Sequence, residues 1–185
     1  MHLGAKNDRN FEGYKPAAIP QALRVIKGNK ELNVVENMTA GSYVRIMKAE
    51  EKRYVGVAVT SPFHNVAGIG EAKQSFEARR DEIQSTVTSD EYVCLHFANE
   101  VVFTYIYCME VSALGAIPDG MIGFTVPSSR YATVRSTEED PYALIHTFLN
   151  DNGMESNPNL FSQEIFRFGE EESKYNADIF VPIAD

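Results

Sequence analysis

The sequence has 185 residues, and its content of 44% hydrophobic and 11% aromatic residues is enough for the core of one domain. Its formal net charge of −9 repels phosphate backbones, so we expect no direct nucleic-acid partner. The first ten residues are polar and no apolar run approaches the about 20 residues of a membrane span, so we expect neither a secretory signal nor a membrane partner. The two cysteines, Cys94 and Cys108, form no CxxC pair, which indicates free thiols and predicts a cytoplasmic protein.

Residues 1–52 are weakly patterned and are predicted to form an N-terminal extension, with prolines and glycines as breaks. Within this extension, Ile19–Lys27 has the pattern of a short helix. Leu32–Glu36 and Tyr43–Lys48 have the pattern of a small hairpin. The main domain is therefore predicted to occupy residues 53–185.

The main domain repeats one order of elements, a strand, a helix and two strands. The first helix is predicted over Ile69–Ile83, because Ile69, Ala72, Phe76 and Ile83 recur near helical spacing. Two such halves can join in one antiparallel sheet with both helices on one face, so we predict a duplicated β-α-β-β fold of the α+β class. The remaining predicted elements are the strands Arg53–Thr60, Glu91–Ala98 and Val101–Val111, the linker Ser112–Gly120, the strand Ser129–Arg135, the helix Pro141–Asn150 with Gly153 as its stop, and the strands Ser162–Phe168 and Asp178–Ile183.

The strands before the linker have two different faces. A two-residue turn at Asn99–Glu100 would pair Ala98 with Val101 and fix which side chains share a face. One face is then aliphatic and is predicted to pack on the helices: Val93, Leu95, Phe97, Val102, Ile106 and Cys108. The other face is aromatic with polar tips: Tyr92, Cys94, His96, Phe103, Tyr105 and Tyr107. This second face suits a ligand cleft, and the open alternative is that it closes against the N-terminal extension or a second subunit.

Glu164 is the first candidate for a functional residue. Alternation along its strand places it on one face with Phe166 and Phe168, and we expect Phe180 to join them. Four aliphatic residues of this hairpin form the expected core set: Ile165, Ile179, Val181 and Ile183. A carboxylate among aromatic rings is costly to bury without a partner, and such a group of rings attracts cations. The alternative is a solvated glutamate, the commoner state of this residue on a strand.

Several stretches together resemble the gyrase-inhibitor-like (GyrI-like) small-molecule-binding family, the effector-binding domain of bacterial transcription activators. They span about residues 53–183 in the family's order. The stretches are YVGVAVTSPF (Tyr54–Phe63), VVFTYIYCMEV (Val101–Val111), IPDGMIGFTVPSSRYATV (Ile117–Val134), YALIHTFLNDNG (Tyr142–Gly153), SQEIFRF (Ser162–Phe168) and ADIFVPI (Ala177–Ile183).

This resemblance implies an SHS2-like repeated β-α-β-β fold with a ligand cleft between the halves. In multidrug-sensing members, an acidic residue of the penultimate strand meets cationic ligands in an aromatic pocket, and Glu164 stands at that position. Tyr105, Tyr107 and Tyr131 match frequent aromatic positions, and Phe148 stands where the second helix often has Trp. The chain departs from the family in having no Trp, with Lys73 where the first helix commonly carries one. It also shows no fused DNA-binding domain, so we expect a stand-alone module.

The resemblance and the strand faces together favour a binding module for a cationic or aromatic amphipathic small molecule, which buffers the compound or reports it to a regulatory protein. An alternative is a hydrolase of reactive electrophiles that uses Glu164 as a general base. A further alternative is a protein-interaction module such as a gyrase inhibitor. The expected ligand-binding residues are Glu164, Tyr105, Tyr107, Tyr131, Phe166, Tyr92, His96, Phe103 and Phe148.

No motif indicates a cofactor or a metal. P-loop, Rossmann and GxSxG patterns are absent, and the histidines have no ligand spacing, so neither a cofactor nor a metal site is expected. Cys94 is interpreted as an inert strand thiol. The acidic run Glu170–Glu172 is interpreted as a solvated loop.

Overall fold

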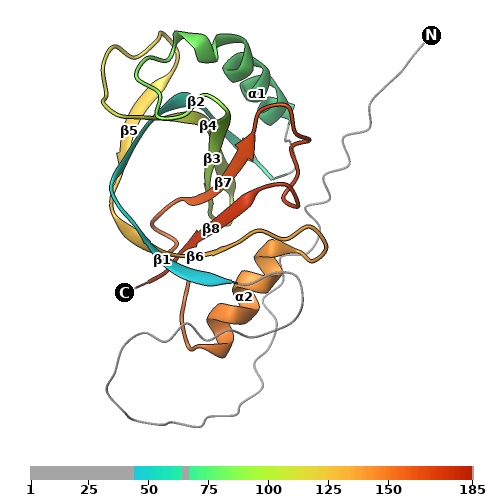
Figure 1. The fold of residues 1–185 in the computed structure, drawn as a ribbon. Coiled ribbons are helices and arrows are strands. Elements are labelled where there is room, and N and C mark those ends of the chain that lie inside the picture. Colours follow the sequence, from blue (N-terminus) through green and yellow to red (C-terminus); the bar gives the residue numbers. More distant parts are fainter. Residues whose placement is uncertain (1–43, 64–66, 185) are drawn as a thin grey trace, which may run out of the picture. The chain divides into compact units, whose positions relative to one another are not determined.

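A computed structural model describes residues 44–63 and 67–184 of the chain (Figure 1). These residues belong to a compact unit that comprises Val34–Asp185. The helix expected at Ile19–Lys27 and the strand expected at Leu32–Glu36 lie outside the described residues.

The described residues form one eight-stranded sheet in which every neighbouring pair of strands is antiparallel. The order across the sheet is β1-β6-β8-β7-β3-β4-β2-β5 (Figure 1). The strands are β1 (Arg45–Ala49), β2 (Lys52–Pro62), β3 (Glu91–Ala98), β4 (Val102–Val111), β5 (Ile122–Val126), β6 (Ser129–Val134), β7 (Ser162–Arg167) and β8 (Asp178–Pro182).

The predicted duplication is confirmed. The first half is β2-α1-β3-β4, the second is β6-α2-β7-β8, and the halves join where β3 pairs with β7. Each half is preceded by a short strand that pairs with the other half: β1 lies on β6, and β5 lies on β2. These exchanged strands cover both edges of the duplicated core.

The edge strands were not predicted in these positions. β5 was missed, because Gly123 and exposed Ile122 weaken the alternation that marks a strand. β1 is the second arm of the hairpin expected in the extension, and it pairs with β6 of the main sheet. Within the described residues, the sheet therefore includes Arg45–Ala49, which lies before the boundary that the sequence predicted at residue 53.

Helix α1 (Ala67–Arg79) buries the predicted stripe of Ile69, Ala72 and Phe76. A short 3-10 turn, Arg80–Glu82, follows the helix and leads to Ile83, whose backbone is extended and whose side chain is buried. The pattern thus predicted all four buried positions but ran the helix through the turn. The turn keeps Ile83 in the core although the α-helix has already ended.

Helix α2 (Pro141–Asp151) begins where its sequence predicts and ends one residue later than predicted. Asp140 is its N-cap, and its carboxylate accepts a hydrogen bond from the backbone nitrogen of Tyr142 at 3.0 Å. Pro141 occupies the first helical position, where its missing N–H costs nothing. Gly153 follows the C-cap with a φ of +63°, a conformation that glycine adopts without strain. These signals fix Tyr142 in the first turn of the helix.

The predicted assignment of the strand faces to the helices is wrong. Phe76 of α1 lies 5.8 Å from Tyr92 and 6.2 Å from Tyr107 between ring centroids, so α1 packs on the aromatic face. Ile145 and Leu149 of α2 belong to the same core cluster. Tyrosine and cysteine pack as buried apolar groups once their polar tips find partners, so the aromatic face serves as the main core.

The aliphatic face forms a second core cluster in which no residue of α1 or α2 takes part. Phe124 of edge strand β5 lies 6.0 Å from Phe161, which precedes the central strand β7, so the sheet curls around this cluster. The cluster consists of Tyr54, Val93, Leu95, Ile106, Cys108 and Val126, with Phe124, Phe161 and Ile165 packed against it. The curled sheet therefore covers its own aliphatic face.

The β3–β4 connection is longer than predicted. Ala98 pairs with Phe103, not with Val101, and the side chain of Asn99 accepts hydrogen bonds from the backbone nitrogens of Val101 and Val102 at 2.9 Å. The register is shifted by two residues. Because side chains alternate with period 2, every residue keeps its predicted face.

Candidate functional site

Glu164 lies on β7 at the junction of the two halves, directly opposite Cys94 of β3. It is 9% exposed. One carboxylate oxygen, Oε2, accepts a hydrogen bond from the hydroxyl of Tyr105 on β4. The other, Oε1, accepts one from Tyr142 on α2 at 2.6 Å. Residues from both halves thus meet at this carboxylate.

His96 extends this network from β3. Its Nε2 lies 2.9 Å from the hydroxyl oxygen of Tyr142, and its ring stacks on Tyr105 at 5.5 Å between centroids. Since the Tyr142 proton is donated to Glu164, the Tyr142 oxygen accepts from His96, which requires the Nε2–H form of the ring. Burial lowers the pKa of His96, and the charge of Glu164 opposes this effect. The result is a chain of hydrogen bonds from a neutral histidine through tyrosine to a carboxylate.

Glu172, in the loop between β7 and β8, is a second buried carboxylate. Its side chain is 5% exposed and lies 2.9 Å from the ammonium nitrogen of Lys73 on α1. Tyr92 donates to its Oε2 at 2.9 Å, and Tyr107 donates to its Oε1 at 3.3 Å. The expectation of a solvated loop is therefore wrong for Glu172, because the loop turns this glutamate inward onto the aromatic face. Glu170 and Glu171 remain exposed, as expected.

The β7–β8 loop is anchored to both helices. Glu172 holds it to α1 through Lys73, and Lys174 holds it to the N-terminus of α2 through Asp140, at 2.5 Å. Asn176 adds a bond within the loop, from its side-chain nitrogen to the carbonyl of Glu171 at 3.1 Å. These bonds fix the position of Glu172 against the aromatic face.

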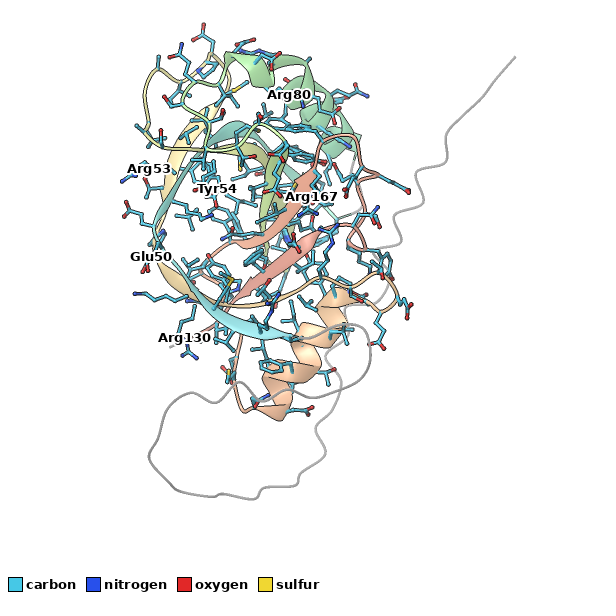
Figure 2. The ribbon with its side chains drawn as sticks, in the orientation of Figure 1. Glu50, Arg53, Tyr54, Arg80, Arg130 and Arg167 are labelled. Atoms are coloured by element: carbon cyan, nitrogen blue, oxygen red, sulfur yellow. The ribbon has the colours of Figure 1, made fainter. Side chains whose placement is uncertain are left out.

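Aromatic rings connect the two carboxylates. Tyr105, which donates to Glu164, lies 5.2 Å from Tyr107, which donates to Glu172. Phe166 stacks on Tyr92, which also donates to Glu172, at 5.4 Å between ring centroids. The guanidinium of Arg80, labelled in Figure 2, lies 4.0 Å from the centroid of the nearby Phe168 ring. We call the two carboxylates, the four tyrosines that donate to them and the ring stacked on Tyr92 the two-carboxylate cluster: Glu164, Glu172, Tyr92, Tyr105, Tyr107, Tyr142 and Phe166.

The Cass2 family, described as integron-associated effector binding protein, matches residues 33–183. The chain belongs to this family. The match confirms the resemblance to GyrI-like small-molecule-binding proteins and indicates a ligand-binding domain of the effector-binding type. No curated protein matches the chain in sequence.

Three solved structures share the fold at low identity. An integron cassette protein of Vibrio cholerae, VCH_CASS2, is 16% identical with a TM-score of 0.52, covering 78% of this chain and 97% of its own. SAV2435, solved bound to tetraphenylphosphonium, is 14% identical with a TM-score of 0.54, covering 76% and 93%. The C-terminal domain of EcmrR is 15% identical with a TM-score of 0.52, covering 77% and 98%. These likenesses show that the effector-binding domain has the fold that its sequence predicted.

Phe103 and Phe148 are two further predicted site residues of this effector-binding domain. Phe103 is half-buried, with its ring 5.5 Å from that of Phe63. Phe148 is half-buried on α2 and packs against the core of the aromatic face. Phe103 also packs against this core, so the structure brings both side chains to the same face as Glu164.

Tyr131 is not part of the two-carboxylate cluster. It pairs with Pro182 in the β6–β8 register, and its ring lies 6.2 Å from Phe180. Phe180 pairs with Gln163, so both aromatic residues lie on the sheet face opposite Glu164. The expectation that Phe180 joins Glu164 is wrong, and Ile179 takes that place instead. The closing hairpin is shifted by one residue from the predicted alternation.

Three residues of the network were not predicted as site residues: Tyr142, Glu172 and Lys73. Tyr142 had a local signal, since an Asp-Pro pair before it fixes the helix start. Lys73 also had a sequence signal, because it stands where the first helix of the family commonly carries Trp. Glu172 had none, because three adjacent glutamates give no indication of which one turns inward.

Within residues 44–63 and 67–184, no group of three or more His, Cys, Asp or Glu side chains is placed to hold a metal ion. No helix in that part of the chain has the length and apolar character needed to cross a membrane.

Proposed function

We propose that this domain binds an amphipathic aromatic cation, with Glu164 as the counter-charge of the ligand. The observation that carries the proposal is that Glu164 is almost buried, while no Lys, Arg or His among the described residues forms an ion pair with it. A buried carboxylate without a cation is costly, and an incoming cation would lower that cost. Its electrostatic partner is therefore expected to come from a ligand.

The rings around Glu164 suit the same ligand. Tyrosine and phenylalanine faces attract cations, more strongly where water is excluded. Tyr105 and His96 lie stacked beside the carboxylate, and Tyr107 and Phe166 extend the apolar surface. The solved complex of SAV2435 with tetraphenylphosphonium, a lipophilic aromatic cation, supports this choice of ligand class by similarity of fold.

Hydrolysis of a reactive electrophile is the second candidate. The hydrogen-bond chain from His96 through Tyr142 to Glu164 favours it, because such a chain can move a proton released from water. Both oxygens of Glu164 already accept tyrosine hydroxyls, so a general base at this position would first have to give up one of these bonds. Binding requires no such change and is the function that we put first.

The test compares tetraphenylphosphonium with the neutral triphenylphosphine oxide by isothermal titration calorimetry. Glu164→Gln should weaken binding of the cation at least about tenfold, since it removes the counter-charge at short range in a partly buried site. Binding of the neutral compound should be unchanged. Glu138→Gln is the matched control, because Glu138 is exposed and its loss changes the net charge equally. Equal cation affinity in wild type and in a folded Glu164→Gln variant would contradict the proposal.

A further inference from the structure

A cavity of about 290 Å³ lies where the start of β6, the turn after α2 and the residues that follow β8 meet. Its lining consists of Arg130, Gly153, Met154, Glu155, Ile183 and Ala184. Its volume is near the lower limit of about 300 Å³ for ligand pockets, so it suits a small molecule. Tyr142, which reaches Glu164, lies in the first turn of α2, whereas Gly153 follows the last turn. The cavity is therefore separate from the two-carboxylate cluster.

Backbone hydrogen bonds fix the walls of this cavity. The backbone nitrogen of Ile183 donates to the carbonyl of Arg130 at 2.9 Å. The backbone nitrogen of Ala184 donates to the carbonyl of Glu155, also at 2.9 Å. That of Met154 donates to a carbonyl in the last turn of α2 at 2.9 Å, which ties the turn to the helix. Little ordering of the backbone is therefore required when a ligand binds.

The two charged side chains of the lining have opposite signs. Arg130, labelled in Figure 2, is half-buried, and Glu155 is exposed. Among the residues that the structure describes, neither side chain forms a hydrogen bond or an ion pair. Ile183 is 2% exposed and Met154 is half-buried, so these two side chains give the lining an apolar part. The cavity thus offers one positive group, one negative group and an apolar wall to the same small molecule.

We propose that this cavity binds a small zwitterion with an apolar side chain, the chemistry of a free aliphatic α-amino acid. Arg130 pairs with the carboxylate of the ligand, Glu155 pairs with its ammonium group, and Met154 and Ile183 pack against its apolar part. A guanidinium presents two parallel N–H donors, which match the two oxygens of a carboxylate. This site does not depend on the cation site proposed at Glu164 and adds a second class of ligand.

Simpler ligands would leave at least one charge of the lining without a partner. A plain anion would pair with Arg130 but would lie near the carboxylate of Glu155, which repels it. A plain cation would pair with Glu155 and be repelled by Arg130 in the same way. An uncharged apolar molecule would displace water from both charged groups and provide no hydrogen bond in return. The zwitterion satisfies both groups at once.

L-Leucine and two analogues test this inference: isocaproate lacks the ammonium group of leucine, and isoamylamine lacks its carboxylate. The readout is the methyl signal of Met154 in carbon–proton correlation spectra of protein labelled at the methionine methyl groups. Met154→Leu assigns this signal, and Met109, buried in the core, is the internal reference. Wild type should bind leucine at least about tenfold more tightly than either analogue, because each analogue lacks one charge-assisted contact.

Two substitutions should each remove one contact. Arg130→Met should weaken leucine about tenfold without weakening isoamylamine, and Glu155→Gln should weaken leucine about tenfold without weakening isocaproate. Lys48→Met is the control for Arg130, because exposed Lys48 lies directly opposite Arg130 on β1 and does not line the cavity. Glu138→Gln is the control for Glu155, because Glu138 is exposed and also lies outside the lining. Both controls should keep the wild-type affinity for leucine.

Three outcomes would overturn the inference. The first is a Met154 signal of wild type that does not respond to leucine. The second is isocaproate binding as tight as that of leucine, which would indicate a simple anion site. Both are measured on wild type and so do not depend on the folding of a variant. The third is an equal leucine affinity of wild type and a folded Arg130→Met variant. Tetraphenylphosphonium binding is measured separately, so these outcomes leave the proposed function at Glu164 unaffected.

Discussion

Cys94 and Glu164 lie directly opposite each other on the paired strands β3 and β7, with the Cys94 side chain fully buried. Burial raises the pKa of the Cys94 thiol, and the negative charges of Glu164 and Glu172 raise it further. The thiolate is the reactive form of cysteine, so this environment suppresses it. Burial beside these negative charges therefore makes Cys94 a packing residue and argues against a nucleophilic role.

We predict that neither cysteine of the folded protein reacts with Ellman's reagent at pH 8. Cys108 is also fully buried, burial raises its pKa, and its Sγ donates to the carbonyl of Val93 at 3.2 Å. Both thiols should react once the protein is unfolded in guanidinium chloride, which serves as the control. Reaction of one thiol in the native protein at the rate of free cysteine would contradict the prediction. A Cys108→Ser variant would then show whether Cys94 is the one exposed.

The sequence predicted which side chains share a face of the central strands, but not which face the helices cover. Period-2 alternation made the first prediction safe even though the β3–β4 register was wrong by two residues. Which face the helices cover depends on tertiary structure. Tyr92 and Tyr107 look semi-polar in sequence. Glu172, 80 and 65 residues away along the chain, accepts hydrogen bonds from their hydroxyls and lets the rings pack under α1.

The candidate site was also predicted only in part, because several of its contacts depend on tertiary structure. Glu164 and Tyr105 could be found from the strand pattern and the family resemblance, and the structure joins them by a hydrogen bond. Tyr142 could not be placed, because its contact with Glu164 depends on how α2 docks on the sheet. The inward turn of Glu172 depends on a loop whose anchors, Lys73 and Asp140, lie on two different helices.

Loss of the Tyr131 hydroxyl and loss of the Tyr105 hydroxyl should have different effects on the free energy of unfolding. Burial raises the pKa of Tyr131, and no described atom completes a hydrogen bond with the Tyr131 hydroxyl. Tyr131→Phe should therefore leave the free energy of unfolding unchanged or raise it by about 1 kcal/mol. Tyr105→Phe leaves an oxygen of Glu164 without its donor and should lower it by about 1–3 kcal/mol.

Urea denaturation of both variants measures this difference. Tyr131→Phe should also keep the tetraphenylphosphonium affinity of wild type, because Tyr131 lies on the sheet face opposite Glu164. A loss of stability in Tyr131→Phe as large as that in Tyr105→Phe would show that the Tyr131 hydroxyl has a partner, and the prediction would be wrong.

His96 should make the protein less stable as the pH falls below about 6.5, the ordinary pKa of histidine. Burial beside Tyr105 and Tyr142 lowers the pKa of His96 in the folded state. Between the folded and unfolded pKa values, the unfolded state binds the proton and the folded state does not, so acidification favours unfolding. The contribution of neutral His96 is complete above pH 6.5 and is lost as the pH falls through the lower, folded value.

Urea denaturation of wild type and His96→Asn at pH values from about 8 to 5 isolates this contribution. The free energy of unfolding of wild type should fall relative to that of the variant as the pH decreases, since the variant has no imidazole to protonate. His146→Asn is the control for removing an imidazole, because His146 is exposed and its side chain contacts Asn150 outside the network of Glu164. If the free energy of unfolding changed with pH in parallel for wild type and His96→Asn, His96 would have the same pKa in the folded and unfolded states. The chain from His96 through Tyr142 to Glu164 would then not require a neutral histidine.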